Sequence, residues 1–259
     1  MKVASRFMTG ALAAGAVALA LASPPATAAP STGPGGAVSA AALYREAIAT
    51  TRSWSVHYVS SSAQSTTSGA KVSLLESGDA GPASGTQTVY FRRGTSNGSI
   101  TIDVIGGITY VKGDLNGLEN LAGLSPLQAA ATAGKWIDFA TTNVAFAQVV
   151  AGVRSDDIAQ QLALSGLLTL GRPRTIHGTA VLAINGTQGS TGSGNGNGTH
   201  QRAVLYVRAH GRHLPVEEDT LTAKGQPSGT FRVTYSNWGE LVRPQAPLAA
   251  VSIGPVTTT

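Results

Sequence analysis

The chain has 259 residues and a formal net charge of +5, and only 12% of its residues are charged. Lys2 and Arg6 lie in the N-terminal leader, so the remainder carries about +3 (5 − 2) with no stripe of Lys and Arg, and we expect no nucleic-acid binding. The sequence contains no cysteine, which excludes disulfides, thiolate metal sites and the acylated cysteine of a bacterial lipoprotein.

Residues 1–28 have the pattern of a secretory signal peptide. Positive residues precede an apolar run over 11–22, and Ala26-Thr27-Ala28 fits a small-x-small cleavage site. The apolar run is too short for a helix that crosses a bilayer about 30 Å thick. We expect cleavage near Ala28 and a protein that is secreted or held in the cell envelope, without a stable transmembrane anchor.

The remaining chain predicts one domain with flexible flanks. Residues 29–40 form a Pro/Gly-rich linker without periodicity, 41–247 form the domain, and 248–259 form a C-terminal tail. Within the domain, the Gly/Ser/Asn-rich run over 188–200 predicts a flexible surface loop between two strands.

The domain opens with a helix and a series of strands. Ser39 is placed to cap an amphipathic helix that carries Leu43, Ala47 and Ile48 on one face. Alternating patterns then predict five strands, in WSVHYVS, KVSLLES, TQTVYFRR, SITIDVIG and ITYVKGD. Short Gly-rich turns such as Gly106-Gly107 indicate antiparallel pairing of consecutive strands.

A helical region separates these strands from a second series. NGLENLAGLSPLQAAATAGK has helical spacing broken near Ser125-Pro126, and WIDFA is a short strand. NVAFAQVVAGV and SDDIAQQLALSGLL are predicted helical, the second capped by Ser155 with an acidic first turn. Four further strands are predicted in RTIHGTAVLAING, QRAVLYVRAH, LPVEEDTLTAK and GTFRVTYSNWG. Because a long sheet twists and curls, we expect an α+β fold, a curled antiparallel sheet (open half-barrel) covered on its concave side by α-helices.

Three phrases carry a resemblance to a known family. They are the opening helix that runs into WSVHYVS, the segment GGITYVKGD followed by a helical stretch and AGKWIDF, and the closing FRVTYSNWGELVRPQAP. In this order the chain resembles the mycobacterial LppX/LprG-type lipoproteins, which share the LolA/LolB-like lipid-carrier fold. The resemblance implies a hydrophobic cavity that holds acyl chains. The chain departs from the family in having no lipobox cysteine, although a soluble carrier needs no anchor.

A cavity of this kind would be lined by the apolar faces of the strands and by the helical region. Each buried methylene of a ligand contributes about 0.8 kcal/mol, so a long chain binds without specific contacts. The alternative is that these residues pack against one another as ordinary core. The candidate lining residues are Val56, Tyr58, Val89, Phe91, Ile100, Ile102, Val104, Leu121, Leu124, Phe146, Val149, Val150, Leu205, Val207, Val233 and Tyr235.

Signatures of catalysis and of metal or cofactor binding are absent from the sequence. No G-x-S-x-G elbow occurs, and His210-x-x-His213 lies in a turn-forming context with Gly211 inside it. We therefore expect a non-enzymatic protein, without a cofactor, that binds a lipid or another apolar small molecule for carriage in the bacterial cell envelope. The alternative is an envelope interaction or regulatory module that uses the same fold to bind a protein partner without a ligand.

Overall fold

The computed structural model describes residues 38–65, 70–143, 146, 149–189, 200–221 and 229–253. The predicted signal peptide, the linker up to residue 37 and nearly all of the predicted loop over 188–200 lie outside the described residues.

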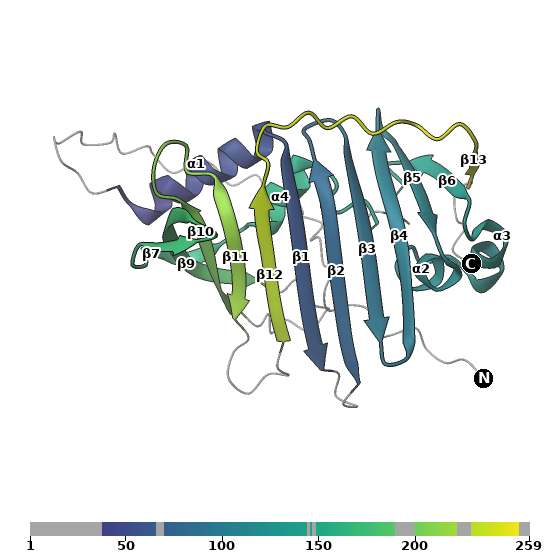
Figure 1. Cartoon of the computed structure of the whole chain (residues 1–259), viewed down its shortest axis with the longest axis horizontal. Helices are drawn as coiled ribbons and strands as arrows, with labels where there is room; N and C mark the ends of the chain where they lie inside the picture. The colour runs from purple at the N-terminus through teal and green to yellow at the C-terminus, as the bar shows by residue number, and fades with distance from the viewer. Residues whose placement is uncertain are drawn as a thin grey trace, which may run out of the picture.

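The described chain is built around a 13-stranded, mostly antiparallel sheet in which one end is formed by β13 and β6 and the other by β9 with β7 and β8. β1 lies at the centre, between β2 and β12, and so joins the two series of strands (Figure 1). The strands are β1 (Val56–Ser65), β2 (Lys71–Ala80), β3 (Gly85–Arg93), β4 (Ser96–Ile105), β5 (Ile108–Gly113), β6 (Trp136–Ala140), β7 (Ser165–Leu170), β8 (Arg174–Ile176), β9 (Thr179–Gly189), β10 (His200–Arg208), β11 (Pro215–Leu221), β12 (Gly229–Ser236) and β13 (Ala250–Ser252).

In the described part of the chain, four α-helices pack on the inner face of the sheet or at its ends. Ser39 caps the first helix as predicted, since its side chain accepts a hydrogen bond from the Ala42 N–H. Ser125 and Gln128 form a capping box at the start of the third. The helices are α1 (Ala40–Ser53), α2 (Leu115–Asn120), α3 (Pro126–Thr132) and α4 (Ser155–Gln161).

Strand alternation produces one buried face and one wetter face, as the sequence pattern predicts. On β1, Val56, Tyr58 and Ser60 are buried on the inner face. His57 points to the outer face, where its Nδ1 lies 2.7 Å from Asp79 Oδ1. The fold class predicted from the sequence, a curled antiparallel sheet with helices on its inner side, is confirmed.

The structure differs from the sequence predictions in its short elements. Residues 165–170 form strand β7 instead of continuing the helix, because α4 ends at Gln161 and Gly166 adopts a positive φ of 75° that a helix does not allow. The N-cap of α4 is Arg154, whose N–H donates to the Asp157 carboxylate, whereas Ser155 is the first helical residue.

The C-terminal segment crosses the ends of the central strands before it joins the sheet. After β12, residues 237–249 run along one edge of the sheet, and β13 then pairs in parallel with β6 (Figure 1). The sheet therefore continues beyond residue 247, the last residue of the domain as predicted from the sequence, into the predicted tail over 248–259.

Candidate functional site

The inner face of the sheet carries two hydrophobic clusters rather than one continuous core. One cluster joins α1 and α4 to β1, β9, β10 and β12. The other joins α2 and α3 to β3, β4, β5 and β6. At the border of the two clusters runs a more polar strip that we call the seam, formed by Tyr58, which also belongs to the first cluster, and by Ser60, Glu76, Gly78 and Gln87.

The predicted lining residues are all buried or partly buried, and the seam divides them between the two clusters. Val56, Tyr58, Leu205, Val207, Val233 and Tyr235 lie in the first cluster. Val89, Ile100, Ile102, Val104, Leu124, Phe146 and Val149 lie in the second, with Leu121 and Val150 packed against it. Phe91 is also buried, and an ideal Cβ at Gly98 would lie 2.6 Å from its ring.

An irregular segment packs over the second cluster and the seam. We call residues 141–154 the cover; 141–143, 146 and 149–154 are described. An α-helix predicted here from the sequence is not found in the described residues: Phe146 is in 3₁₀ conformation, 149–153 form turns and bends, and Gly152 has a φ of 87°. Phe146 stacks on Phe139 of β6 with ring centroids 4.2 Å apart. The middle of the cover thus packs on the sheet through side chains, while its ends are also held by the backbone, through the Thr141 N–H bond to the Gly107 carbonyl and a bridge between Arg154 and Gly81.

A small pocket lies between the cover and the inner face of the sheet. Its volume is about 20 Å³, which is enough for roughly one water-sized group. Five predicted residues line it together with three that the sequence analysis did not include. The predicted ones are Val89, Ile100, Ile102, Leu121 and Val149, and the others are Glu76, Gln87 and Ala151. In this closed arrangement the two faces are in contact, with no space for an alkyl chain at this pocket.

Two carboxylic acids lie on the inner face in one register row of the sheet. Glu76 pairs with Ser60, Ser60 with Val233, and Val233 with Glu218. With neighbouring strands roughly 4.8 Å apart, the two acids are separated by about 14 Å. Glu76 borders the pocket, whereas Glu218 is only 1% exposed within the first cluster. The row therefore places an acid on each side of the centre of the inner face.

Burial controls the charge of both acids. It raises the pKa of Glu76 to about 7, against a smaller opposing effect of its hydrogen bond with Ser60. It raises the pKa of Glu218 to about 8, although Tyr235 donates a hydrogen bond to that carboxyl. Gln188 Nε2 lies 3.4 Å from Glu218 Oε1, and Gln188 Oε1 accepts a hydrogen bond from the Thr220 hydroxyl. Near neutral pH Glu218 is therefore mainly protonated and Glu76 is protonated in about half of the molecules, whereas an exposed glutamate would be ionised.

The hydroxyl of Tyr58 has no hydrogen-bond partner among the described residues. Tyr58 is 2% exposed, and its Oη is a buried polar atom. The ring reaches over β2 at Gly78, where an added Cβ would lie 3.0 Å from both Oη and Cε1. Burial raises the pKa of the Tyr58 hydroxyl, and the charge of Glu76 has the next largest effect in the same direction. Glu76 lies on the same strand face as Gly78, two residues before it in β2. The seam therefore contains an unsatisfied polar group beside an acid.

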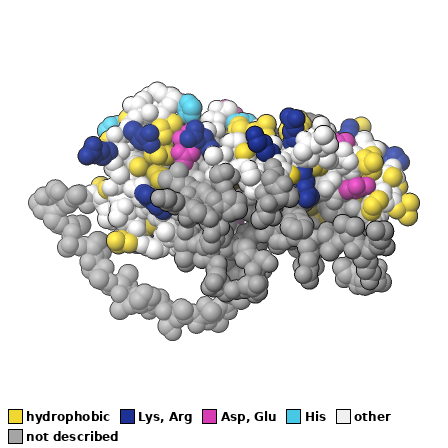
Figure 2. Space-filling view, turned by 90° about the horizontal axis from the view of Figure 1, so that it is seen from below, with side chains coloured by type: hydrophobic (Ala, Val, Ile, Leu, Met, Phe, Trp, Pro, Cys, Tyr) yellow, Lys and Arg dark blue, Asp and Glu magenta, His cyan; other side chains and the backbone are white. Residues whose placement is uncertain are grey.

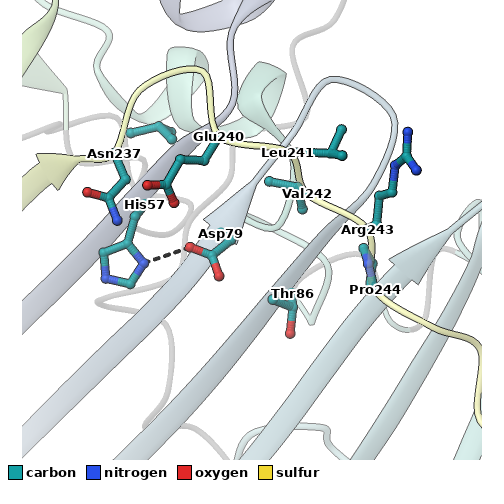
Figure 3. Close-up of a pocket in the computed structure, with 10 residues that line it drawn as sticks. His57, Asp79, Thr86, Asn237, Glu240, Leu241, Val242, Arg243 and Pro244 are labelled. Carbon is teal, nitrogen blue, oxygen red and sulfur yellow. Dashed lines mark hydrogen bonds and ion pairs between the residues drawn. The ribbon is translucent and has the colours of Figure 1, made fainter.

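A second, larger pocket lies on the other side of the sheet. Its volume is about 220 Å³, and it is enclosed between the outer ends of β1, β2 and β3 and residues 237–244 (Figure 3). His57 and Asp79 are hydrogen-bonded within it, with Thr86 and Glu240 nearby. Among the described residues no hydroxyl is hydrogen-bonded to His57, so the His57–Asp79 pair has no neighbouring nucleophile to activate there.

The sequence indicated the apolar lining but not the acids. One face of β2 carries Val72, Leu74 and Glu76, but the other face also carries a leucine, Leu75. The sequence pattern therefore does not show which face of β2 is buried, nor whether Glu76 points inward. Glu218 had a weak signal, because it alternates with Val216 and Thr220 in a strand that also carries Glu217 and Asp219.

The fold has relatives among solved structures. The chain is similar in structure to LprF from Mycobacterium bovis, with 13% identity, a TM-score of 0.49 and coverage of 80% of this chain and 96% of that one. It is also similar to the lipoprotein LppX from Mycobacterium tuberculosis, with 17% identity, a TM-score of 0.47 and coverage of 79% and 97%. A LolA superfamily protein from Nitrosomonas europaea matches with 14% identity, a TM-score of 0.28 and coverage of 81% and 96%.

LppX and the LolA superfamily are also the proteins that the sequence phrases resemble. At such low identities the similarity concerns the fold alone. No family model matches the sequence, and no curated protein matches it significantly. Among the described residues, no helix combines the length and apolar character that crossing a membrane requires. Nor do the His, Asp and Glu residues of the described chain form a cluster of three that could hold a metal ion.

Proposed function

We propose that this protein is a non-enzymatic carrier in the bacterial cell envelope that binds an apolar, chain-like molecule such as a lipid acyl chain. The binding site is the space between the inner face of the sheet and the cover. One observation supports the proposal: the apolar pocket there, lined by residues such as Ile100, Ile102 and Val149, is covered by a segment that contains no α-helix or strand among its described residues.

The closed pocket requires the cover to move when a ligand binds. Sites for small molecules have volumes of roughly 300–1,000 Å³, far above the 20 Å³ enclosed here. The cover's backbone forms turn bonds such as Phe146 N–H to Asn143 C=O and Val149 N–H to Phe146 C=O. Lifting the part around Phe146 and Val149 breaks apolar contacts but leaves intact the pairing of β3, β4 and β5 and the backbone bonds at the two ends of the cover. A ligand offsets that loss with about 0.8 kcal/mol for each methylene it buries.

Native mass spectrometry of the protein purified from its host tests this proposal. We expect a co-purifying mass that organic solvent removes and that lipid extraction identifies. Ala151→Trp places a large ring in the pocket from the cover side, and it should abolish the co-purifying mass. The matched control is Thr101→Trp, on the outer face of β4. Repeated absence of any ligand from the wild-type protein, with the fold intact by circular dichroism, would refute the proposal.

A second candidate function is the binding of an envelope protein without a ligand. It is favoured by apolar side chains that gather at the end of the molecule where α3 lies, visible in Figure 2. Leu127 of α3 is 81% exposed there, and Leu115 of α2 is 43% exposed. Leu127→Ser should then abolish capture of a partner from envelope extracts, whereas it should leave ligand binding unchanged if the protein is a carrier.

A further inference from the structure

We propose that the seam holds the polar end of the ligand and selects a head group that donates hydrogen bonds, such as a hydroxyl or an ammonium group, over a carboxylate. This inference rests on the proposed function and specifies its ligand class. The groups concerned are the Tyr58 hydroxyl, the Ser60 hydroxyl and the Glu76 carboxyl, with Gln87 beside them.

The position of these groups follows from the register of three neighbouring strands. Tyr58 pairs with Gly78, and Gly78 pairs with Gln87, so these residues form one row across β1, β2 and β3. In the adjacent row Ser60 pairs with Glu76. The polar groups of both rows thus meet on the inner face, at the border of the two hydrophobic clusters.

The seam is joined to the apolar pocket under the cover. Glu76 and Gln87 line that pocket together with Val89, Ile100 and Val149. A ligand that enters beneath the cover would therefore place its alkyl chain against the second cluster and its polar end against the seam. An amphipathic ligand fits this arrangement, because a polar end needs a polar environment when it leaves water.

The unsatisfied Tyr58 hydroxyl indicates that the seam is built for an additional partner. A buried polar group without a hydrogen bond costs about 1–3 kcal/mol, and a phenylalanine would fill the same volume without this cost. Its position over Gly78 depends on the missing side chain, since a Cβ there would lie only 2.5 Å from the Thr86 carbonyl oxygen and 3.0 Å from the tyrosine ring. Tyr58 and Gly78 together keep a hydroxyl beside Glu76.

The chemistry of the seam favours donors over anions. A carboxyl accepts hydrogen bonds from a hydroxyl or an ammonium group, and the Tyr58 oxygen can accept or donate. A carboxylate head would instead lie close to Glu76 on the seam and within about 14 Å of Glu218, with no Lys or Arg among the residues that form the seam or line the pocket in the described chain. Like charge in a buried setting disfavours such a ligand.

The experiment compares three probes of equal chain length on the full mature protein at about pH 8, by isothermal titration calorimetry. Monopalmitoylglycerol carries a neutral hydroxyl head, hexadecylamine a cationic one and palmitate an anionic one. We expect the first two to bind about tenfold or more tightly than palmitate, as a charge-assisted or newly satisfied buried hydrogen bond allows. A difference between the first two probes shows whether the neutral or the cationic head is preferred.

Two variants localise the selection to the seam. Glu76→Gln keeps the size of the side chain and should bring the affinity for palmitate to within about threefold of that for monopalmitoylglycerol. The matched control Asp103→Asn removes a carboxyl from the outer face of β4 and should leave the preference unchanged. Tyr58→Phe should weaken binding of monopalmitoylglycerol by about threefold to tenfold without destabilising the free protein.

The outcomes separate this inference from the proposed function. Equal binding of all three probes, tighter binding of palmitate, or a preference that survives both Glu76→Gln and Tyr58→Phe would overturn the role of the seam while chain binding stands. Failure of all three probes to bind would overturn both proposals.

Discussion

Glu218 makes the stability of the protein depend on pH in a direction opposite to that of an ordinary surface acid. Burial raises its pKa from 4.5 to about 8, and this side chain is 1% exposed. The unfolded chain therefore releases the proton at lower pH than the folded chain does. Stability from the protonated acid is complete below pH 4.5 and is lost as pH rises towards about 8. At about 1.4 kcal/mol for each pH unit between these values, the loss is on the order of 4 to 5 kcal/mol.

Glu218→Gln tests this effect because glutamine resembles the protonated acid in size and hydrogen bonding. Its side chain can still accept from Tyr235 and Gln188. Urea unfolding followed by circular dichroism at about pH 5 and about pH 9 should give similar stabilities for the two proteins at the lower pH. At the higher pH the variant should be more stable by several kcal/mol. Glu46→Gln, which removes an exposed acid of α1, should leave the wild-type pH dependence unchanged.

Two results would refute the reasoning. One is a wild-type protein whose free energy of unfolding stays constant or increases between these pH values. The other is a Glu218→Gln variant that loses as much stability as the wild type over the same range. Glu76 acts in the same direction, with a pKa of about 7, so a smaller residual loss in the variant is part of the expectation.

Three further predictions concern the seam and the cover. Tyr58→Phe should raise the free energy of unfolding by about 1 kcal/mol, measured by urea titration, because it removes an unsatisfied buried hydroxyl; a loss of 1 kcal/mol would contradict this. Gly78→Ala should lower that free energy by about 2 kcal/mol or more, since its Cβ would meet the Thr86 carbonyl at 2.5 Å, and an unchanged thermal midpoint would contradict the described packing. Phe146→Ala should remove the stack on Phe139 and cost about 3 kcal/mol, with faster hydrogen exchange in the cover than in β4; uniform acceleration would show that the cover does not open separately.

The alternation of apolar residues was sufficient to predict the inner face of the sheet. Val56 and Tyr58 in β1, and Ile100 and Ile102 in β4, follow a strict period of two and are buried as expected. Patterns of this kind are local, and the short turns between β3, β4 and β5 make the pairing of neighbours predictable as well. The fold class followed from these features.

The features that the sequence could not predict depend on contacts between distant segments. β7 is defined by its pairing with β9, and β13 by its pairing with β6, so neither has a strong local pattern. The cover has helical spacing, yet its described residues form turns and a 3₁₀ residue at Phe146, in keeping with the packing of Phe146 on Phe139 and the positive φ of Gly152. The seam is similarly non-local, because it requires the register of three strands before Tyr58 and Glu76 are seen to lie together.

The central claim is that an apolar chain binds between the cover and the inner face of the sheet, and photo-crosslinking tests it most directly. A palmitoyl lipid with a diazirine near the end of its chain would be bound, irradiated and located by mass spectrometry of the digested protein. We predict that fragmentation of the labelled peptides places the label on Ile100, Ile102, Leu121 or Val149, all of which line the pocket. Labels placed only on outer-face residues such as Thr101 and Asp103, or competition-resistant labels spread over the whole chain, would contradict it.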